Sequence, residues 1–256
     1  MAGRLFIGTS GFAYAEWKGG FYPRDLKSDA MLRFYAERFP SVEINYTFQR
    51  HPTEKMIAKW LTDTPEDFRF SLKANRGITH MHRLKAGAAA PLGEFLTSIE
   101  PLGDRVGALL FQCAPNFKMD LVVLQEFLAM LPAGPRYAFE FRHDSCDTDE
   151  VRGVLAARGA AWCVVDDDDR DATLVRTAPG FAYLRLRKTS YDDEALARWA
   201  KEIEAMLADG TDVYCYFKHE QEARGVHFAQ MLSRGLDDRL SSGPTWPTTE
   251  TAEPQR

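Results

Sequence analysis

Charged and bulky apolar residues alternate along one short stretch of the chain, residues 137–144 (Tyr-Ala-Phe-Glu-Phe-Arg-His-Asp). Side chains alternate between the two faces of a strand, so this spacing places Glu140 and Arg142 on one face and Phe139 and Phe141 on the other. The alternation recurs in other strand-like runs, each with polar residues near its carboxyl end. These runs are 42–45, 68–73, 183–187 and 213–218. Several strands that end in polar groups predict one shared site.

The residue types in these runs indicate acid–base chemistry on an anion. Glu43 and Glu140 are candidates for the general acid and base, and Lys73 is a third candidate catalytic residue. A lysine buried among other cations has a lowered pKa and can act as a base or as a Schiff-base nucleophile. Arginine suits bidentate binding of a carboxylate or phosphate, and lysine supplies a point charge. The residues predicted to bind or orient the substrate are Ser10, Asn45, Gln112, Arg142, His143, Arg185, Arg187, Lys218 and His219.

Two other interpretations fit the same residues. In the first, Glu140 pairs with Arg142 and Glu43 with Lys73, and these ion pairs only stiffen the structure, because buried charges are costly unless they are paired. In the second, Glu43, Glu140 and Asp166, together with a histidine, bind a divalent metal. The spacing does not require that metal, and no other cofactor is predicted.

Two further sets of residues near the predicted site have both a functional and a packing interpretation. His80, like His143, directly follows a predicted strand and serves either the site or the packing of a loop. The aromatic residues of the loop after the first strand either stack on a base or sugar, or pack as a lid or plug, and packing is favoured. They are Phe12, Tyr14, Trp17, Phe21 and Tyr22.

Strands and helices alternate along the chain, and they must position these residues. Strands are predicted at 4–8, 41–45, 68–73, 106–112, 137–144, 161–166, 181–187 and 212–218. Helices are predicted at 28–38, after a cap at Thr53, and at 91–100, 120–131, 147–158, 192–208 and 225–234. The alternation implies parallel strands with right-handed crossovers, and eight such units match a closed (β/α)8 TIM barrel of the α/β class. An open doubly wound sheet is the alternative, but no GxGxxG turn follows the first strand.

The predicted barrel is one domain, residues 1–236, and it is expected to be irregular in places, as in the basic segment 74–90. Residues 237–256 are rich in Ser, Thr and Pro, so a disordered tail is predicted there. In a TIM barrel the active site lies at the carboxyl ends of the strands, which is where the polar residues gather.

Composition limits the possible partners. The chain has 256 residues, 45% of them hydrophobic, and a formal net charge of -5. This charge argues against a basic surface for nucleic acid over the whole protein, although a local basic cleft stays open as an alternative. No apolar run has the length of a membrane span and no secretory leader is evident, so a cytoplasmic protein is expected. The cysteines lack metal-site spacing and are expected to be reduced and structural, with Cys113 the one to test for reactivity.

Several motifs together resemble the DUF72 family, also called YecE-like. The resemblance rests on segments spread from residue 5 to about residue 235. They are Gly8-Thr9-Ser10-Gly11 with Trp17, Glu43-x-Asn45-x-Thr47-Phe48, Phe70-x-x-Lys73, Leu110-Phe111-Gln112, Glu140-Phe141-Arg142-His143 and Val213-Tyr214-x-Tyr216-Phe217. The resemblance implies a TIM barrel, in agreement with the strand count, and it implies no established activity.

The chain departs from the usual pattern of that family at Phe12 and Gln49, and at two points near the predicted mouth. Arg187-Lys188 stands where the family is expected to have His-Gly, and Lys218-His219 where it has Asn-Asn. These changes make the mouth more cationic. The leading hypothesis is therefore an enzyme, a hydrolase or another proton-transfer catalyst, that acts on a small or nucleotide-like anion. The rival hypotheses are a metal-dependent phosphoesterase acting on nucleic acid and a non-catalytic metabolite-binding protein; the oligomeric state stays open.

Overall fold

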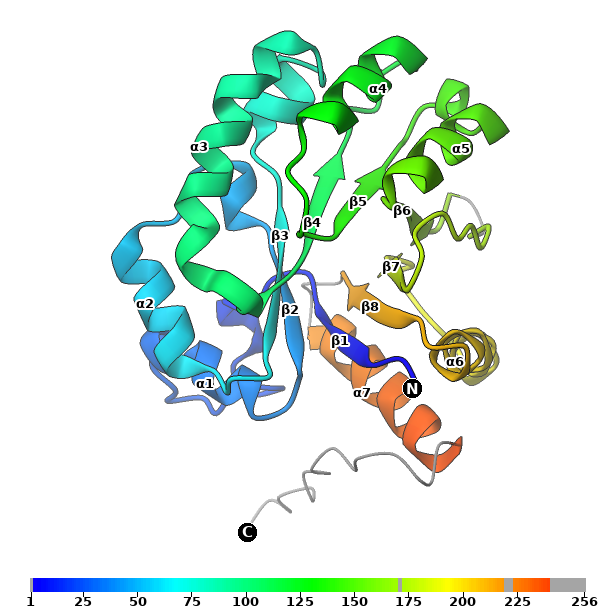
Figure 1. Ribbon diagram of the computed structural model, residues 1–256. Coiled ribbons are helices and arrows are strands. Elements are labelled where there is room, and N and C mark those ends of the chain that lie inside the picture. Colours follow the sequence, from blue (N-terminus) through cyan, green and yellow to red (C-terminus); the bar gives the residue numbers. More distant parts are fainter. Residues whose placement is uncertain (1, 170–171, 219–222, 240–256) are drawn as a thin grey trace, which may run out of the picture.

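Eight parallel strands form the centre of the molecule (Figure 1). In this computed structural model, residues 2–169, 172–218 and 223–239 are described. The strands lie in the order β1-β8-β7-β6-β5-β4-β3-β2, so each neighbours the strands before and after it in the chain. They are β1 (Leu5–Thr9), β2 (Ser41–Ile44), β3 (Arg69–Lys73), β4 (Val106–Gln112), β5 (Tyr137–Glu140), β6 (Ala161–Asp166), β7 (Phe181–Leu186) and β8 (Asp212–Phe217). The predicted TIM barrel is confirmed.

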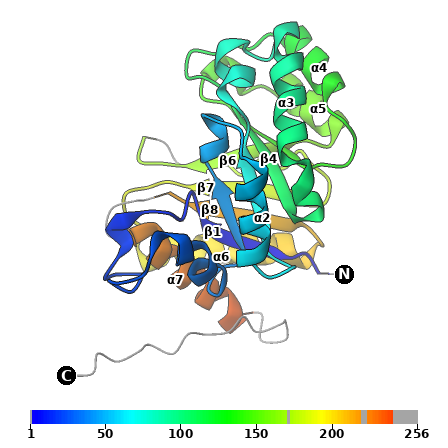
Figure 2. The ribbon, with the colours of Figure 1, turned by 90° about the vertical axis from the view of Figure 1, so that its left-hand side faces the viewer.

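The α-helices lie outside the strands, with α3, α4 and α5 on one side and α6 and α7 on the opposite side (Figure 2). They are α1 (Met31–Ala36), α2 (Glu54–Asp63), α3 (Ala89–Ile99), α4 (Leu121–Met130), α5 (Asp149–Arg158), α6 (Asp193–Ala208) and α7 (Arg224–Arg239). Thr53 caps α2, as predicted, by accepting a hydrogen bond from the Met56 backbone N–H at 3.3 Å. The cap of α5 is Thr148 rather than the predicted Asp147.

The barrel is least regular in three places. Between β6 and β7, the described residues of 167–180 form no helix, so one crossover is a plain loop. The basic segment 74–90 contains a turn of π-helix, η4 (Gly77–Met81), and the short helix η5 (Ala86–Ala88). At the carboxyl end, α7 continues past the predicted end of the domain at residue 236. Residues 240–256 of the predicted tail lie outside the described residues.

The barrel closes where β1 meets β2. Here one bridge between Ser10 and Glu43 joins the strands, and the Gly11 N–H donates to the Glu43 carbonyl at 2.8 Å. The backbones approach so closely that a Cβ on Gly8 would lie 2.0 Å from the Ser41 carbonyl oxygen. A glycine is required at this point of closure because any side chain would push the two strands apart.

Strand alternation decides what fills the barrel. Apolar and aromatic residues of the inner face form a buried cluster that includes Phe6, Leu110, Tyr183, Tyr214 and Tyr216. Residues of opposite parity pack outward against the helices in a larger core. The inner cluster fills the lower part of the barrel, so only the last inward-facing residue of each strand is left to line the mouth.

The aromatic residues of the first loop pack in or against the core, with Trp17 and Tyr22 buried and the other three half-buried. Trp17 and Tyr22 are each 1% exposed, and their rings stack with centroids 6.0 Å apart. The hydroxyl of Tyr22 donates to the Phe12 carbonyl at 2.6 Å. Packing in the core is therefore the role of these two residues, and neither offers a free face to a base or sugar.

Candidate functional site

A layer of polar side chains lines the barrel interior at the carboxyl ends of six strands, and we call it the charged layer. Each stands at the last inward-facing position of its strand, where strand alternation turns the side chain away from the helices. This layer consists of Ser10, Glu43, Lys73, Gln112, Glu140 and Arg185. The sequence predicted all six residues for one site, and the topology brings them together.

Arg185 lies at the centre of this layer and joins its two carboxylates. Its Nη2 donates to Glu43 Oε1 at 2.9 Å, and its Nη1 donates to Glu140 Oε2. The side chain of Arg185 is 3% exposed, and those of Glu43 and Glu140 are 0% and 1% exposed. Three charges are thus buried together, which is tolerable because every carboxylate oxygen faces a donor.

The Glu43 carboxylate accepts two further hydrogen bonds besides that from Arg185. The Ser10 hydroxyl donates to Oε1, and the Tyr183 hydroxyl donates to Oε2 at 2.8 Å. Ser10 in turn accepts from the Asn45 amide at 2.8 Å. Burial raises the pKa of Glu43, but Arg185 and the hydrogen bonds lower it more, so its pKa lies below the ordinary value. Glu43 is therefore ionised at neutral pH.

Glu140 is held more tightly still. Its Oε1 accepts from Gln112 Nε2 at 2.8 Å and from Arg142 Nε at 3.0 Å, and Arg187 Nη1 lies 3.6 Å away. Burial opposes ionisation, yet the guanidinium groups of Arg185, Arg142 and Arg187 hold the pKa of Glu140 far below its usual range. The predicted pairing of Glu140 with Arg142 is present, whereas Glu43 pairs with Arg185 rather than with Lys73.

Lys73 contacts an aromatic ring rather than a carboxylate of the charged layer. Its Nζ lies 4.1 Å from the centroid of the Phe48 ring and makes no hydrogen bond or ion pair with the rest of the described chain. Burial, and then the charge of Arg185, lower the pKa of Lys73 to about 8. A fraction of about one in ten of this amine is thus neutral at pH 7, far more than for an ordinary lysine.

His80 contacts the same aromatic ring as Lys73, that of Phe48. The His80 and Phe48 rings meet edge to face with centroids 5.0 Å apart, and His80 Nδ1 bonds the Thr79 hydroxyl at 2.9 Å. Partial burial and the charges of Lys73 and Arg142 lower the pKa of His80. The imidazole is therefore neutral at physiological pH and able to donate or accept a proton.

Some predicted residues do not join the mouth. Asp166 was expected there, but it stands one position out of phase on β6 and faces the helices. Its Oδ2 accepts from Trp199 Nε1 at 3.0 Å, and its Oδ1 pairs with Lys188 at 3.1 Å. His143 accepts from the Ser145 N–H at 3.1 Å and lies outside the charged layer, and His219 lies outside the described residues.

The donor set does not fit the predicted metal site. With Asp166 turned outward, Glu43 and Glu140 both face Arg185 rather than each other. Across residues 2–169, 172–218 and 223–239, no group of three His, Cys, Asp or Glu side chains is placed to share a metal ion. The buried carboxylates are thus neutralised by guanidinium groups.

Sequence reasoning missed two residues of the site. Tyr183 binds Glu43, and its position two residues before Arg185 on the same face of β7 was the available signal. Phe48 lies under Lys73 and beside His80, and it was noted only as part of a motif. Both were overlooked because aromatic residues on a strand or after one are ordinarily core residues.

Comparisons with known proteins place the chain among uncharacterised relatives. The profile of the family described as "Protein of unknown function DUF72" matches residues 6–251. This chain belongs to the DUF72 family. UPF0759 protein YunF of Bacillus subtilis is 28% identical over 93% of this chain and 96% of its own length. UPF0759 protein YecE of Escherichia coli is 34% identical over 113 residues, which span 44% of this chain and only 41% of YecE.

A DUF72 structure has the same fold. The crystal structure of a DUF72 family protein from Thermotoga maritima superposes with a TM-score of 0.81 at 26% identity, covering 91% of this chain and 99% of that one. The motif residues that suggested DUF72 are largely those of the mouth, since Ser10, Glu43, Asn45, Lys73 and Gln112 all occur in them. The DUF72 motifs therefore describe the charged layer as well as the fold.

Proposed function

We propose that this DUF72 protein is an enzyme that uses the amine of Lys73 on a small anionic carbonyl compound, in a proton-transfer or lyase-type reaction. The observation that carries the proposal is the unengaged Lys73 amine, with its pKa lowered to about 8, set among fixed cations. The neutral amine can accept a proton, or add to a carbonyl carbon with loss of water to form a C=N bond.

The charge balance of the mouth supports the proposal of anion binding. Glu43 and Glu140 supply two negative charges, which the guanidinium groups of Arg185 and Arg142 already balance, so the charge of Lys73 is in excess. Arg142 bonds Glu140 through Nε, and its terminal nitrogens make no hydrogen bond to any described residue. These nitrogens form the planar fork that suits a carboxylate or phosphate.

One nitrogen of the buried Arg185 guanidinium has no hydrogen-bond acceptor among the described residues. Arg185 Nε is buried and has no hydrogen-bond partner in the described parts of the chain. Buried polar groups are normally satisfied, so an unpartnered donor at a cationic mouth is consistent with a ligand. We assign Glu43 and Glu140 the role of fixing Arg185 and setting the charge of the mouth, because both are engaged by cations and stay ionised.

Pyridoxal 5′-phosphate, an aldehyde that carries a phosphate, tests this proposal without knowledge of the natural substrate. The protein is incubated with the aldehyde, reduced with borohydride, and mapped by mass spectrometry. We expect Lys73 to be labelled well ahead of Lys201, an exposed lysine of α6 that serves as the internal control. Pyridoxal, which lacks the phosphate, should label Lys73 poorly, and inorganic phosphate should compete.

The variant Arg142→Gln should weaken phosphate-guided labelling of Lys73 and leave labelling of Lys201 unchanged. Equal labelling of the two lysines, or equal labelling by both aldehydes, would show that the mouth does not guide an anion to the amine. A positive result justifies a search for turnover among phosphorylated and carboxylated carbonyl compounds.

A further inference from the structure

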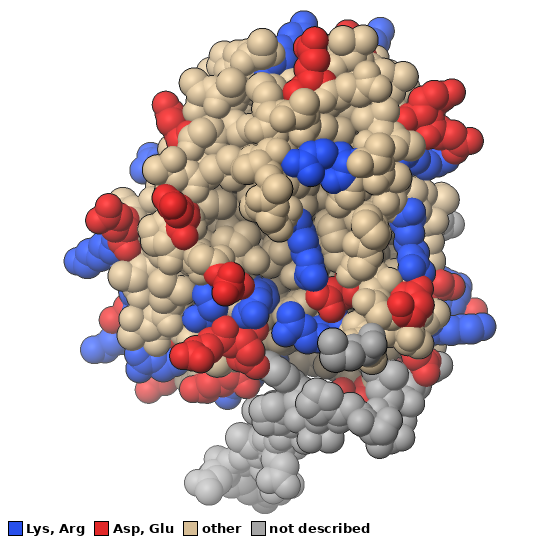
Figure 3. Space-filling view, viewed as in Figure 1, with Lys and Arg blue, Asp and Glu red and all other residues tan. Residues whose placement is uncertain are grey.

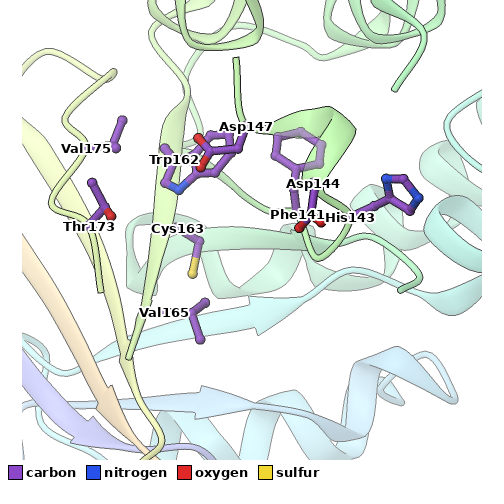
Figure 4. A pocket seen from close by; sticks show the side chains of 9 residues that line it. All are labelled: Phe141, His143, Asp144, Asp147, Trp162, Cys163, Val165, Thr173 and Val175. Carbon is purple, nitrogen blue, oxygen red and sulfur yellow. The ribbon is translucent and has the colours of Figure 1, made fainter. Parts of the chain in front are cut away.

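A pocket of about 340 Å³ lies between the carboxyl-terminal parts of β5 and β6. These strands pair only at Ala138 with Ala161 and at Phe139 with Trp162, and then diverge. The pocket lies where the pairing has ended (Figure 4). Its lining residues are Phe141, His143, Asp144, Asp147, Trp162, Cys163, Val165, Thr173 and Val175.

The floor of the pocket belongs to the same inner face as the charged layer. Cys163 and Val165 are alternate residues of β6 and so share one face of the strand. Val165 pairs in register with Arg185 on β7. Burial raises the pKa of the Cys163 thiol; the charge of Glu140 raises this pKa further, and the charge of Arg185 opposes the rise. The pocket is therefore adjacent to the charged layer.

The walls divide into an apolar body and a polar rim. Phe141 and Trp162 contact each other with ring centroids 5.3 Å apart, and Val175 lies on the segment that leads into β7. At the rim, Asp144 and Asp147 are exposed carboxylates. Asp147 pairs with Arg152, whereas Asp144 has no ion pair among the described residues. The charge of Asp144 disfavours an anion at the outer end, so an amphipathic anion would enter with its charge directed inward, toward Arg185 and Arg142.

We propose that this pocket, the β5–β6 window, receives a flat apolar group of the substrate whose carboxylate or phosphate is bound at the mouth. This inference rests on the proposed function, and it names the substrate class as organic anions with an aryl or comparable apolar body. A pocket of this volume is at the lower end of the range for small-molecule sites, which combine apolar walls with few polar groups.

Calorimetric binding of phenyl phosphate and methyl phosphate tests the window, because the two esters share the anion and differ in the apolar group. Burial of a phenyl ring in apolar surroundings should make phenyl phosphate bind at least about tenfold more tightly. Val165→Phe, which fills the floor, should reduce that ratio to about one and leave methyl phosphate binding unchanged. Val122→Phe, on an exposed position of α4, is the matched control and should keep the ratio.

Val175→Phe fills the window from a loop and serves as the second variant if Val165→Phe does not fold. A ratio near one in the unmodified protein overturns the window while the anion site stands. A ratio that persists in the folded window variants also overturns it. If neither ester binds the unmodified protein, the proposed function fails together with this inference.

Discussion

Arg185 determines the electrostatics of the site because, among the described residues, it alone bonds both buried carboxylates of the charged layer. Removing an ion from water costs free energy, and only close ion pairing and hydrogen bonds offset this desolvation cost inside the barrel. Ser10, Tyr183 and Gln112 supply the remaining hydrogen bonds. Breaking this set should therefore harm stability more than the loss of one exposed ion pair would.

Glu140→Gln should lower the free energy of unfolding by about 3 to 5 kcal/mol, because it leaves buried guanidinium groups without their counter-charge. Urea unfolding at pH 7 measures the change. Glu202→Gln, at an exposed position of α6, is the matched control and should change stability by less than about 0.5 kcal/mol. An unchanged unfolding midpoint for Glu140→Gln would contradict the structural role assigned to this carboxylate.

Lys73→Met should have the opposite effect and stabilise the fold by about 1 to 2 kcal/mol at pH 7, because it removes a charge that is poorly compensated. The folded-state pKa of about 8 lies below the ordinary value of the unfolded chain, so the unfolded state binds more protons between pH 8 and about 10.4. The stability of the unmodified protein should rise relative to the variant across that window.

Chemical denaturation of both proteins from pH 7 to pH 10 measures this difference. A stability gap that stays constant over the range, or a variant less stable at pH 7, would show that the Lys73 amine is not depressed in the folded state. If Lys73→Met is more stable than the unmodified protein and is no longer labelled by the aldehyde, Lys73 serves chemistry rather than stability.

Individual site residues could be predicted where strand phase was certain. Glu43, Lys73 and Arg185 were assigned from alternation and all face the mouth. Asp166 was assigned to the mouth wrongly, because β6 carries charge only at its end, and a strand end alone does not reveal which face a residue occupies. The side chains that pair across the barrel come from strands far apart in sequence, so the partner of Glu43 could not be predicted.

At the scale of elements, the strands and most helices followed from periodicity and caps. The π-helical turn at Gly77–Met81 could not be predicted, because its wide turn depends on packing between 74–90 and the barrel rim rather than on local propensity. The pocket between β5 and β6 could not be predicted either, because the separation of these strands depends on tertiary packing rather than on their own sequences.

Gly8→Ala tests the closure between β1 and β2. Its Cβ would overlap the Ser41 carbonyl, so the strands must separate, and we expect a loss of about 1 to 3 kcal/mol in the free energy of unfolding. Gly153→Ala on α5 is the control, since a Cβ there meets nothing within 4 Å. That change should be stabilising by about 0.5 to 1 kcal/mol. If both changes had the same effect on thermal unfolding, Gly8 would not be required for closure.

At the scale of the whole molecule, the surface charges of the described residues form no broad basic patch on the face shown in Figure 3. Basic and acidic side chains are interspersed on the face shown in Figure 3, which agrees with the net charge of -5. Among the described helices, none is long and apolar enough to cross a membrane. The barrel itself was predictable from eight alternating units, whereas the substrate depends on side-chain geometry that composition does not encode.

The most direct test of the account is the pKa of Lys73, measured by carbon-13 NMR of the reductively methylated protein, with the Lys73 signal assigned by its absence in Lys73→Met. The account predicts a pKa of about 8 that rises when inorganic phosphate is added, because a bound anion stabilises the charged amine. A pKa near 10.4 that does not respond to phosphate would contradict both the depressed amine and the anion site.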